Sequence, residues 1–174
     1  MKKFNRRTYR NFSAFMDDLK TIMAKRDQMR PLMRGEIIDA AFRERLMLAV
    51  TAVNGCRYCS YAHARQALIE GIHQDEISAL QDGIKEDSPK DELPGLLYAQ
   101  HWAETQGRTD PLAREQFTEN YDAETVKAIE LTLQTIQMGN LLGNTADYIL
   151  FRLSFGRFGI GKTESVKADQ KSLS

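Results

Sequence analysis

The sequence predicts an all-α protein, a single-domain helical bundle. In most segments apolar residues recur every three or four positions, which is the period of a helix with one buried face. No segment joins alternating apolar residues to the turn pairs that indicate a sheet. The 174 residues, 42% of them hydrophobic, suffice for one buried core, so we expect a single domain over 1–174.

The first predicted helix lies close to the N-terminus. Asn11 or Ser13 can cap it, and apolar residues recur at helical spacing through FMDDLKTIMAKRD. The apolar face of this helix needs a partner surface. We therefore interpret residues 1–30 as a helical arm and expect the arm to favour an oligomer.

The next two predicted helices meet at a tight junction. The stretch IIDAAFRERLMLAVTAV predicts a helix that stops at Asn54 and Gly55, because both residues tolerate the left-handed conformation of a helix end. The following helix carries Cys56 and Cys59, starts directly after this stop and is expected to end at Gly71.

Two further helix starts are indicated before residue 93. Asp75 and Glu76 open the short helix EISALQDG, since acidic residues suit the positive end of a helix dipole. Ser88 followed by Pro89 predicts the start of a helix through ELPGLLYAQHWAET, in which Pro94 disturbs the first turn.

The last two predicted helices begin at aspartates. Asp110, which precedes a proline, starts LAREQFTENY, and Asp122 caps the long stretch that begins AETVKAIEL. Gly139 and Gly143 lie four residues apart on this stretch and allow another helix to approach closely. The polar tail 159–174 is predicted to be mobile.

The charge balance argues against nucleic acid and membrane partners. The chain has 24 basic and 24 acidic residues, so it has no overall field that would attract nucleic acid or an anionic membrane. Its longest apolar run is far shorter than the ~20 residues that cross a bilayer, and no apolar signal core follows the basic start. We therefore expect a cytoplasmic protein.

The two cysteines carry the strongest chemical signal. A disulfide between Cys56 and Cys59 would close too short a loop to stabilise the fold much. Cys56 lies at a predicted helix start, where the dipole favours a thiolate, and Cys59 lies one turn later. His63, four residues on, projects from the same face as Cys59. An attacking thiol, a resolving thiol and a base are the set that thiol redox chemistry needs.

Glu44 is the best candidate to orient the histidine. It lies in the preceding helix, and the turn at 54–55 returns the chain so that Glu44 can lie beside His63. The sequence leaves open which thiol is the more acidic. The helix dipole favours Cys56, whereas proximity to the histidine favours Cys59.

These residues resemble a known family. Glu44, eleven residues, Cys56-x-x-Cys59, three residues and His63 are similar to the Glu-x11-Cys-x2-Cys-x3-His signature of the alkylhydroperoxidase D branch of the carboxymuconolactone decarboxylase-like family. The continuation ALIEGIHQDEISAL is also similar to that family, and the resemblance covers 36–82.

The resemblance implies a function and its residues. Cys59 would attack a hydroperoxide and Cys56 would resolve the product, with no metal or organic cofactor. His63 would be the base and Glu44 the head of the proton relay. An external dithiol donor, such as a lipoyl-type protein, would restore the thiols, and the protein would assemble as a homotrimer or homohexamer.

One residue inside the motif departs from the family pattern. The family's characterised peroxidases have a histidine directly before the second cysteine, and this chain has Tyr58. Tyr58 and Tyr61 flank the site and can either line a substrate entrance or pack as ordinary aromatics. Asn140 and Asn144 are polar positions on the long last helix and are candidates to support the site.

Other interpretations of the same residues stay open. Cys56 and Cys59 can be small buried hydrophobes, and Glu44 can be an exposed glutamate paired with a neighbouring arginine. A zinc site needs further ligands, and the remaining histidines, His73 and His101, make no familiar pattern with the cysteines. The alternative functions are a redox-responsive binding or scaffold protein without turnover and a carboxymuconolactone decarboxylase-like lyase.

Overall fold

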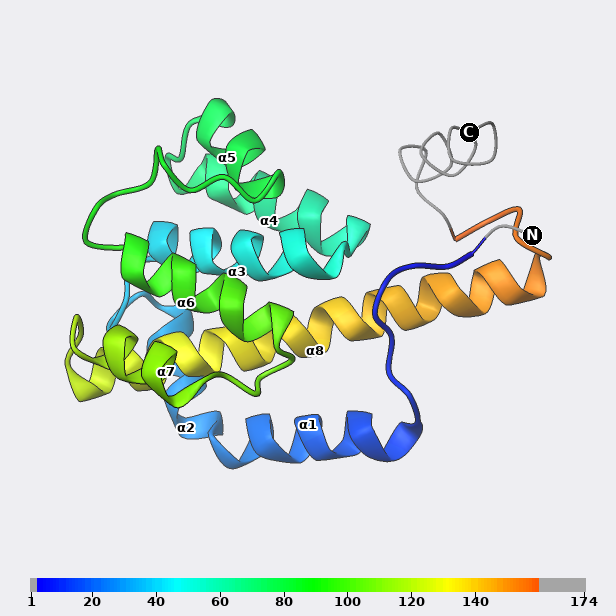
Figure 1. The fold of residues 1–174 in the computed structure, drawn as a ribbon, viewed down its shortest axis with the longest axis horizontal. Coiled ribbons are helices and arrows are strands. Elements are labelled where there is room, and N and C mark those ends of the chain that lie inside the picture. Colours follow the sequence, from blue (N-terminus) through cyan, green and yellow to red (C-terminus); the bar gives the residue numbers. More distant parts are fainter. Residues whose placement is uncertain (1–2, 160–174) are drawn as a thin grey trace.

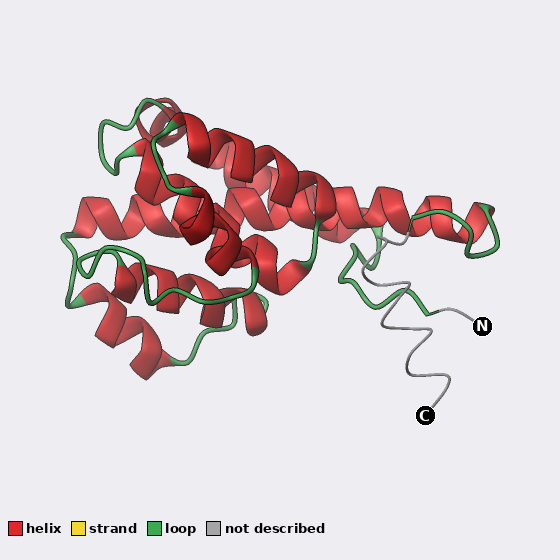
Figure 2. Ribbon diagram, turned by 90° about the horizontal axis from the view of Figure 1, so that it is seen from above, coloured by secondary structure: helices red, strands yellow, loops and turns green. Residues whose placement is uncertain are grey.

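The computed structural model describes residues 3–159, and this part of the chain contains eight helices and no strand. The predicted all-α bundle is confirmed (Figures 1 and 2). The helices, in chain order, are α1 (Phe12–Ala24), α2 (Arg26–Met33), α3 (Ala40–Asn54), α4 (Arg57–Ile69), α5 (Gln74–Gln81), α6 (Leu93–Glu104), α7 (Pro111–Thr118) and α8 (Ala123–Leu153).

Helix α3 is the centre of the bundle. It packs against α4, α5, α6 and α8 (Figure 1). The run LMLAV leaves α3 without a polar face over more than one turn, and Leu46, Leu48 and Val50 are completely buried. Because α3 is covered on several sides, the charged residues Arg43 and Glu44 in its second turn are buried as well.

Two apolar clusters hold the helices around α3. The larger cluster joins α3 to α6 and α8, with Leu46, Leu96 and Ile129 among its completely buried members. The smaller cluster packs Leu48 of α3 against the hairpin of α4 and α5, where Ala67 is also fully buried. Helix α4, which carries Cys59, is therefore fixed to α3 by packing on its inner face.

Most predicted helix starts are confirmed, but one is wrong. The side chains of Asn11, Asp110 and Asp122 each accept a backbone N–H of the helix that follows. Helix α6, by contrast, begins at Leu93, and Ser88-Pro89 belongs to a turn that precedes it. Pro94 lies in the first turn of α6, where its missing N–H would have had no partner in the helix anyway.

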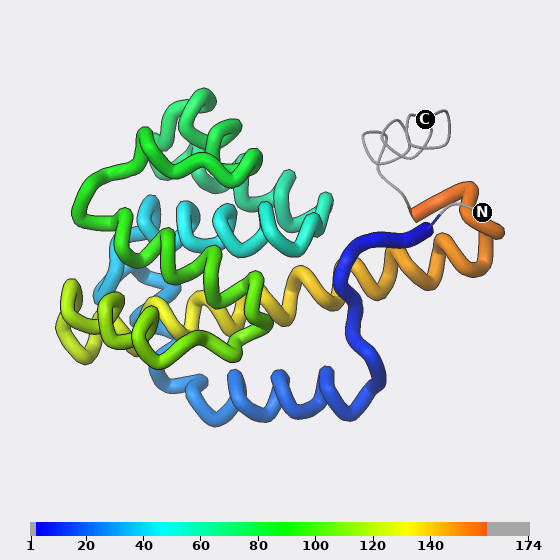
Figure 3. Tube along the Cα trace, in the orientation of Figure 1, coloured from blue at the N-terminus to red at the C-terminus, as the bar shows by residue number. Residues whose placement is uncertain are grey.

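The N-terminal arm is helical only from Phe12. Residues 3–11 form an irregular segment that passes along α8 before the chain turns into α1 (Figure 3). The backbone N–H of Tyr9 donates to Thr145 Oγ1 at 3.0 Å, which fastens the segment to α8. The predicted mobile tail, 159–174, lies outside the described residues except for Gly159.

The second half of α8 projects beyond the bundle (Figures 1 and 2). Apolar side chains remain exposed there, and we call them the α8 apolar end: Leu142, Ile149, Leu150 and Leu153, with exposed fractions of 51%, 51%, 46% and 74%. None of the helices within residues 3–159 is long and apolar enough to cross a membrane.

Candidate functional site: a thiol pair beside a buried glutamate and a histidine

The junction between α3 and α4 positions both thiols. Gly55 ends α3 in the left-handed conformation, with φ of 69°, as the sequence predicts. Cys56 then caps α4, and its Sγ atom accepts the backbone N–H of Cys59 at 3.4 Å. The Cys56 side chain is completely buried, whereas Cys59 is half-buried.

The two thiols are close enough to react with each other. Their Sγ atoms lie 2.7 Å apart and are not bonded. A hydrogen bond from Cys59 lowers the pKa of Cys56 to about 6, against the opposing effect of burial, with help from backbone N–H groups and the charge of Arg6. The same contact with Cys56 raises the pKa of Cys59, and burial raises it further. The shared proton therefore belongs on Cys59 and the negative charge on Cys56.

Glu44 and His63 are brought together as the sequence predicts. The Nδ1 atom of His63 lies 2.7 Å from Glu44 Oε2. Glu44 is only 3% exposed, so it is not the surface glutamate of the alternative interpretation. Within residues 3–159 the His63 ring has no other hydrogen-bond partner, which leaves Nε2 available to exchange a proton.

A buried arginine neutralises Glu44. Arg43 Nε lies 3.4 Å from Glu44 Oε1, and Arg43 Nη1 donates to the carbonyls of Leu32 and Met33. Arg45, the other neighbouring arginine, pairs instead with Glu76 of α5 and with Glu92, which directly precedes α6. The carboxylate of Glu44 thus has a fixed cation on one side and the histidine on the other.

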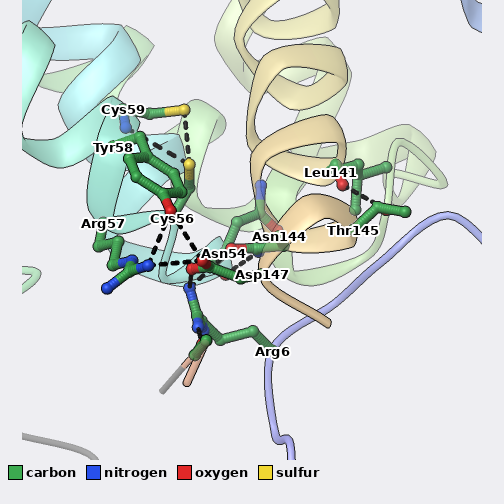
Figure 4. A network of polar contacts seen from close by, with 11 residues as sticks. Arg6, Asn54, Cys56, Arg57, Tyr58, Cys59, Leu141, Asn144, Thr145 and Asp147 are labelled. Atoms are coloured by element: carbon green, nitrogen blue, oxygen red, sulfur yellow. Dashed lines mark hydrogen bonds and ion pairs between the residues drawn. The ribbon is translucent and has the colours of Figure 1, made fainter. Parts of the chain in front are cut away.

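A polar network that the sequence analysis missed lies next to Cys56. Asp147 of α8 is completely buried and accepts hydrogen bonds from Arg6 at 2.7 Å, Arg57 at 2.7 Å and Tyr58 at 2.9 Å. Burial alone would raise the pKa of Asp147, but these bonds outweigh burial and hold the pKa below its ordinary value. Figure 4 shows the three donors converging on Asp147 from α4 and the N-terminal segment.

A row of polar side chains on α8, which we call the polar stripe, is hydrogen-bonded to the C-terminal part of α3, just before the thiols. Asn144 donates to the backbone carbonyl of Asn54 at 2.8 Å, and Asn140 accepts from the Thr51 hydroxyl at 3.2 Å. Both asparagines are completely buried and contact residues of α3, and their role in supporting the site stays a prediction. Gln137, Asn140, Asn144 and Asp147 recur at three and four residues, and this spacing was the sequence signal for the missed member, Asp147.

The close helix approach predicted from the glycines occurs at Gly143. A Cβ atom built on Gly143 would lie 2.8 Å from Cys56 Sγ, so the backbone of α8 itself covers this sulfur. Gly139 has no such neighbour. Tyr58 and Tyr61 lie on the outer surface of α4, with exposed fractions of 48% and 72%.

Sequence comparison finds that these residues are similar to a known family. Residues 22–84 match the family model described as the carboxymuconolactone decarboxylase family, and this segment contains both cysteines, Glu44 and His63. Over this segment the chain is similar to that family. The family segment ends before α8, so Asp147 and the polar stripe lie outside it, as does Arg6. A search of curated proteins finds no match to the chain.

The geometry bears on the zinc interpretation as well. Within residues 3–159, no three His, Cys, Asp or Glu side chains come together in a way that could hold a metal ion. The zinc alternative therefore lacks a ligand set in this part of the chain.

Proposed function

We propose that the protein is a thiol-dependent peroxidase of the alkylhydroperoxidase D-like branch of its family. The observation that carries the proposal is the pair of Sγ atoms 2.7 Å apart with one thiol acidified to a pKa of about 6. The Glu44–His63 contact at 2.7 Å supplies a base close to the same helix turn. The similarity of residues 22–84 to the carboxymuconolactone decarboxylase family supports the assignment, because that segment contains all four residues.

The difference in burial supports the peroxide-attacking role for Cys59. Cys56 is completely buried beneath α8, whereas Cys59 is half-buried, so Cys59 is the cysteine that an external peroxide approaches more readily. As the Cys59 sulfur bonds to the peroxide oxygen, its proton passes to His63, and Glu44 stabilises the resulting imidazolium. The O–O bond breaks, the departing alkoxide takes the proton back from His63, and Cys59 is left as a sulfenic acid.

The acidity of Cys56 suits the steps that follow. The Cys56 thiolate attacks the sulfenic sulfur, a disulfide forms, and the released hydroxide takes a proton from solvent to give water. A dithiol donor, such as a lipoyl-type protein, then attacks the accessible Cys59 sulfur. Cys56 leaves as a stabilised thiolate, the second donor thiol closes the donor's own disulfide, and Cys59 is released. Recycling of this kind suits the reducing cytoplasm.

The test is steady-state hydroperoxide consumption with a dithiol donor. The wild type is expected to turn over, and Cys59→Ser and His63→Gln are expected to lose at least about 100-fold in rate, the usual contribution of a positioned base. His73→Gln is the matched control, because His73 is exposed at the start of α5. If the wild type forms its disulfide once and never turns over, the peroxidase proposal fails and a redox-responsive binding protein is the better description.

A lyase of the decarboxylase type makes a different prediction. Decarboxylation of a lactone acid would not need the thiols, so a doubly substituted Cys56→Ser, Cys59→Ser protein would retain it. Thiol-independent loss of carbon dioxide from such a substrate, without hydroperoxide consumption, would replace the peroxidase assignment with a lyase.

A further inference from the structure

A cavity that neither cysteine lines lies against α8. It has a volume of about 570 Å³ and is enclosed by the N-terminal segment, α1, the C-terminal end of α6 and its following loop, and α8. This volume is within the range of small-molecule sites, which is roughly 300–1,000 Å³. The residues that decide its chemistry are Arg7, Arg10, Trp102, Arg108, Gln137 and Leu141.

The cavity carries an excess of positive charge. Within residues 3–159, none of its three arginines has a carboxylate at ion-pair distance. Arg7 donates to the carbonyls of Ala103 and Glu104 at the end of α6, so it has backbone acceptors but no carboxylate partner. Asp18 is the one carboxylate among the described lining residues, and the Tyr9 hydroxyl already donates to it at 2.8 Å.

A buried amide in the wall has a free donor. Gln137 is only 8% exposed, and its Oε1 atom accepts from Asn54 Nδ2 at 2.6 Å. Its Nε2 group has no hydrogen-bond acceptor within residues 3–159, although Gln137 lines the cavity. This donor group keeps some contact with solvent, so it can donate to an acceptor oxygen of a molecule in the cavity.

The remaining wall is suited to an apolar body. The Trp102 indole, Ile22 and Leu141 line the same cavity. We propose that this cavity binds a small organic acid, with its anionic group on Arg10 and Arg108, a ring-sized apolar part against Trp102, and an acceptor oxygen on Gln137. The site is separate from the thiols, so the proposal holds whether or not they turn over peroxide.

Calorimetric titration of the full chain tests the proposal with four probes. Benzoate and phenyl phosphate carry a ring and either acid group, benzamide is the neutral counterpart of benzoate, and inorganic phosphate lacks the ring. At least one of the two ring acids is expected to bind at least tenfold more tightly than benzamide and inorganic phosphate. The stronger of the two ring acids identifies the acid group as carboxylate or phosphate.

Substitutions locate the binding. Arg10→Gln and Arg108→Gln, both at exposed positions, are each expected to weaken the better acid roughly tenfold, since a charge-assisted hydrogen bond contributes about that factor. Gln137→Glu keeps an acceptor for Asn54, places a carboxylate at the cavity and is expected to abolish binding. Arg26→Gln is the matched control, because the Arg26 side chain is 75% exposed on α2 and paired with Asp27.

Three outcomes would overturn the organic-acid site. The first is no binding of either ring acid up to 10 mM, roughly the weakest affinity that a ligand of this size should show. The second is that neither ring acid binds more tightly than both benzamide and inorganic phosphate. The third is binding that Arg10→Gln and Arg108→Gln change no more than Arg26→Gln does.

Discussion

The acidic thiol and the accessible thiol are different residues in this site. Cys56 gains the negative charge because Cys59 donates to it through both its thiol and its backbone N–H. Cys59 keeps the proton and is the less buried of the two cysteines. The helix start thus favours the thiolate at Cys56, as one of the two sequence arguments expects, and under the proposed function Cys59 is the attacking thiol that the histidine serves.

The lowered pKa of Cys56 predicts how stability depends on pH. The folded pKa of about 6 lies below the ordinary value of 9.0, so the group stabilises the fold fully above pH 9 and not at all below pH 6. The raised pKa of Cys59 matters only above pH 9, where an unfolded thiol ionises. We expect the wild type to lose more stability than Cys56→Ser between pH 8.5 and 5.5.

Denaturant unfolding at the two pH values measures this difference, and thiolate absorbance gives the pKa itself. In Cys59→Ala the absorbance midpoint of Cys56 should rise, because the largest cause of the lowered pKa is removed while burial remains. A midpoint near 6 that Cys59→Ala leaves unchanged would show that Cys59 does not acidify Cys56.

Glu44→Gln separates the catalytic relay from simple support of the fold. The amide cannot stabilise a protonated His63, so kcat/KM for hydroperoxide should fall about 100-fold. Arg43 loses its buried counter-charge, and the free energy of unfolding should fall by about 3 kcal/mol. Glu36→Gln is the control, since its side chain is 53% exposed. Lost stability with full activity would mean that Glu44 serves Arg43 alone.

At the scale of elements, the backbone of α8 packs directly against the Cys56 sulfur. Gly143→Ala should crowd Cys56 Sγ, which a new Cβ would approach to 2.8 Å, and we expect a net loss of about 1–2 kcal/mol in the free energy of unfolding. Gly139→Ala is the matched control on the same helix. Nothing lies within 4 Å of its new Cβ, so it should stabilise by about 0.5–1 kcal/mol.

Both glycine variants are compared by thermal or denaturant unfolding. The rate of Cys56 to Cys59 disulfide formation should also change in Gly143→Ala, because the displaced sulfur changes its distance to Cys59, and stay constant in Gly139→Ala. Equal stabilisation by both alanines would show that α8 shifts to make room for the new methyl group and does not restrict the position of the Cys56 sulfur.

The helices also show which structural features could be predicted from the sequence alone. Local signals sufficed for the turn at Gly55, the cap of α4 and the return of Glu44 to His63, because each depends on neighbours in one helical hairpin. The predicted helix start at Ser88 was wrong because a serine followed by a proline favours a turn as readily as the start of a helix. Local patterns carry no information on the bond from Arg6 to Asp147, which joins residues 141 positions apart.

At the scale of the whole molecule, the described residues leave apolar side chains of α8 exposed. The N-terminal segment lies along α8 (Figure 3), with the backbone of Tyr9 bonded to Thr145 and Arg6 bonded to Asp147, and the side chains of the α8 apolar end are exposed. Contiguous exposed apolar surface on a protruding element marks an interaction site. We propose that a further copy of the chain covers it in the homotrimer or homohexamer implied by the family resemblance.

The doubly substituted Ile149→Glu, Leu153→Glu protein tests this assembly. These side chains are 51% and 74% exposed, so the charges are tolerated in a monomer but not in an apolar contact between copies. Light scattering after size exclusion should give a trimer or hexamer for the wild type and a monomer for the variant. Leu112→Glu, at a 67% exposed position on α7, is the control and should leave the mass unchanged.

A monomeric wild type would contradict the assembly, whereas an oligomer that survives the double substitution would place its contacts away from α8. Asp147 lies between the thiols and this end of α8, so the variant also tests whether assembly affects the thiol site. If the variant is a monomer and keeps full peroxidase activity, one chain holds the complete site.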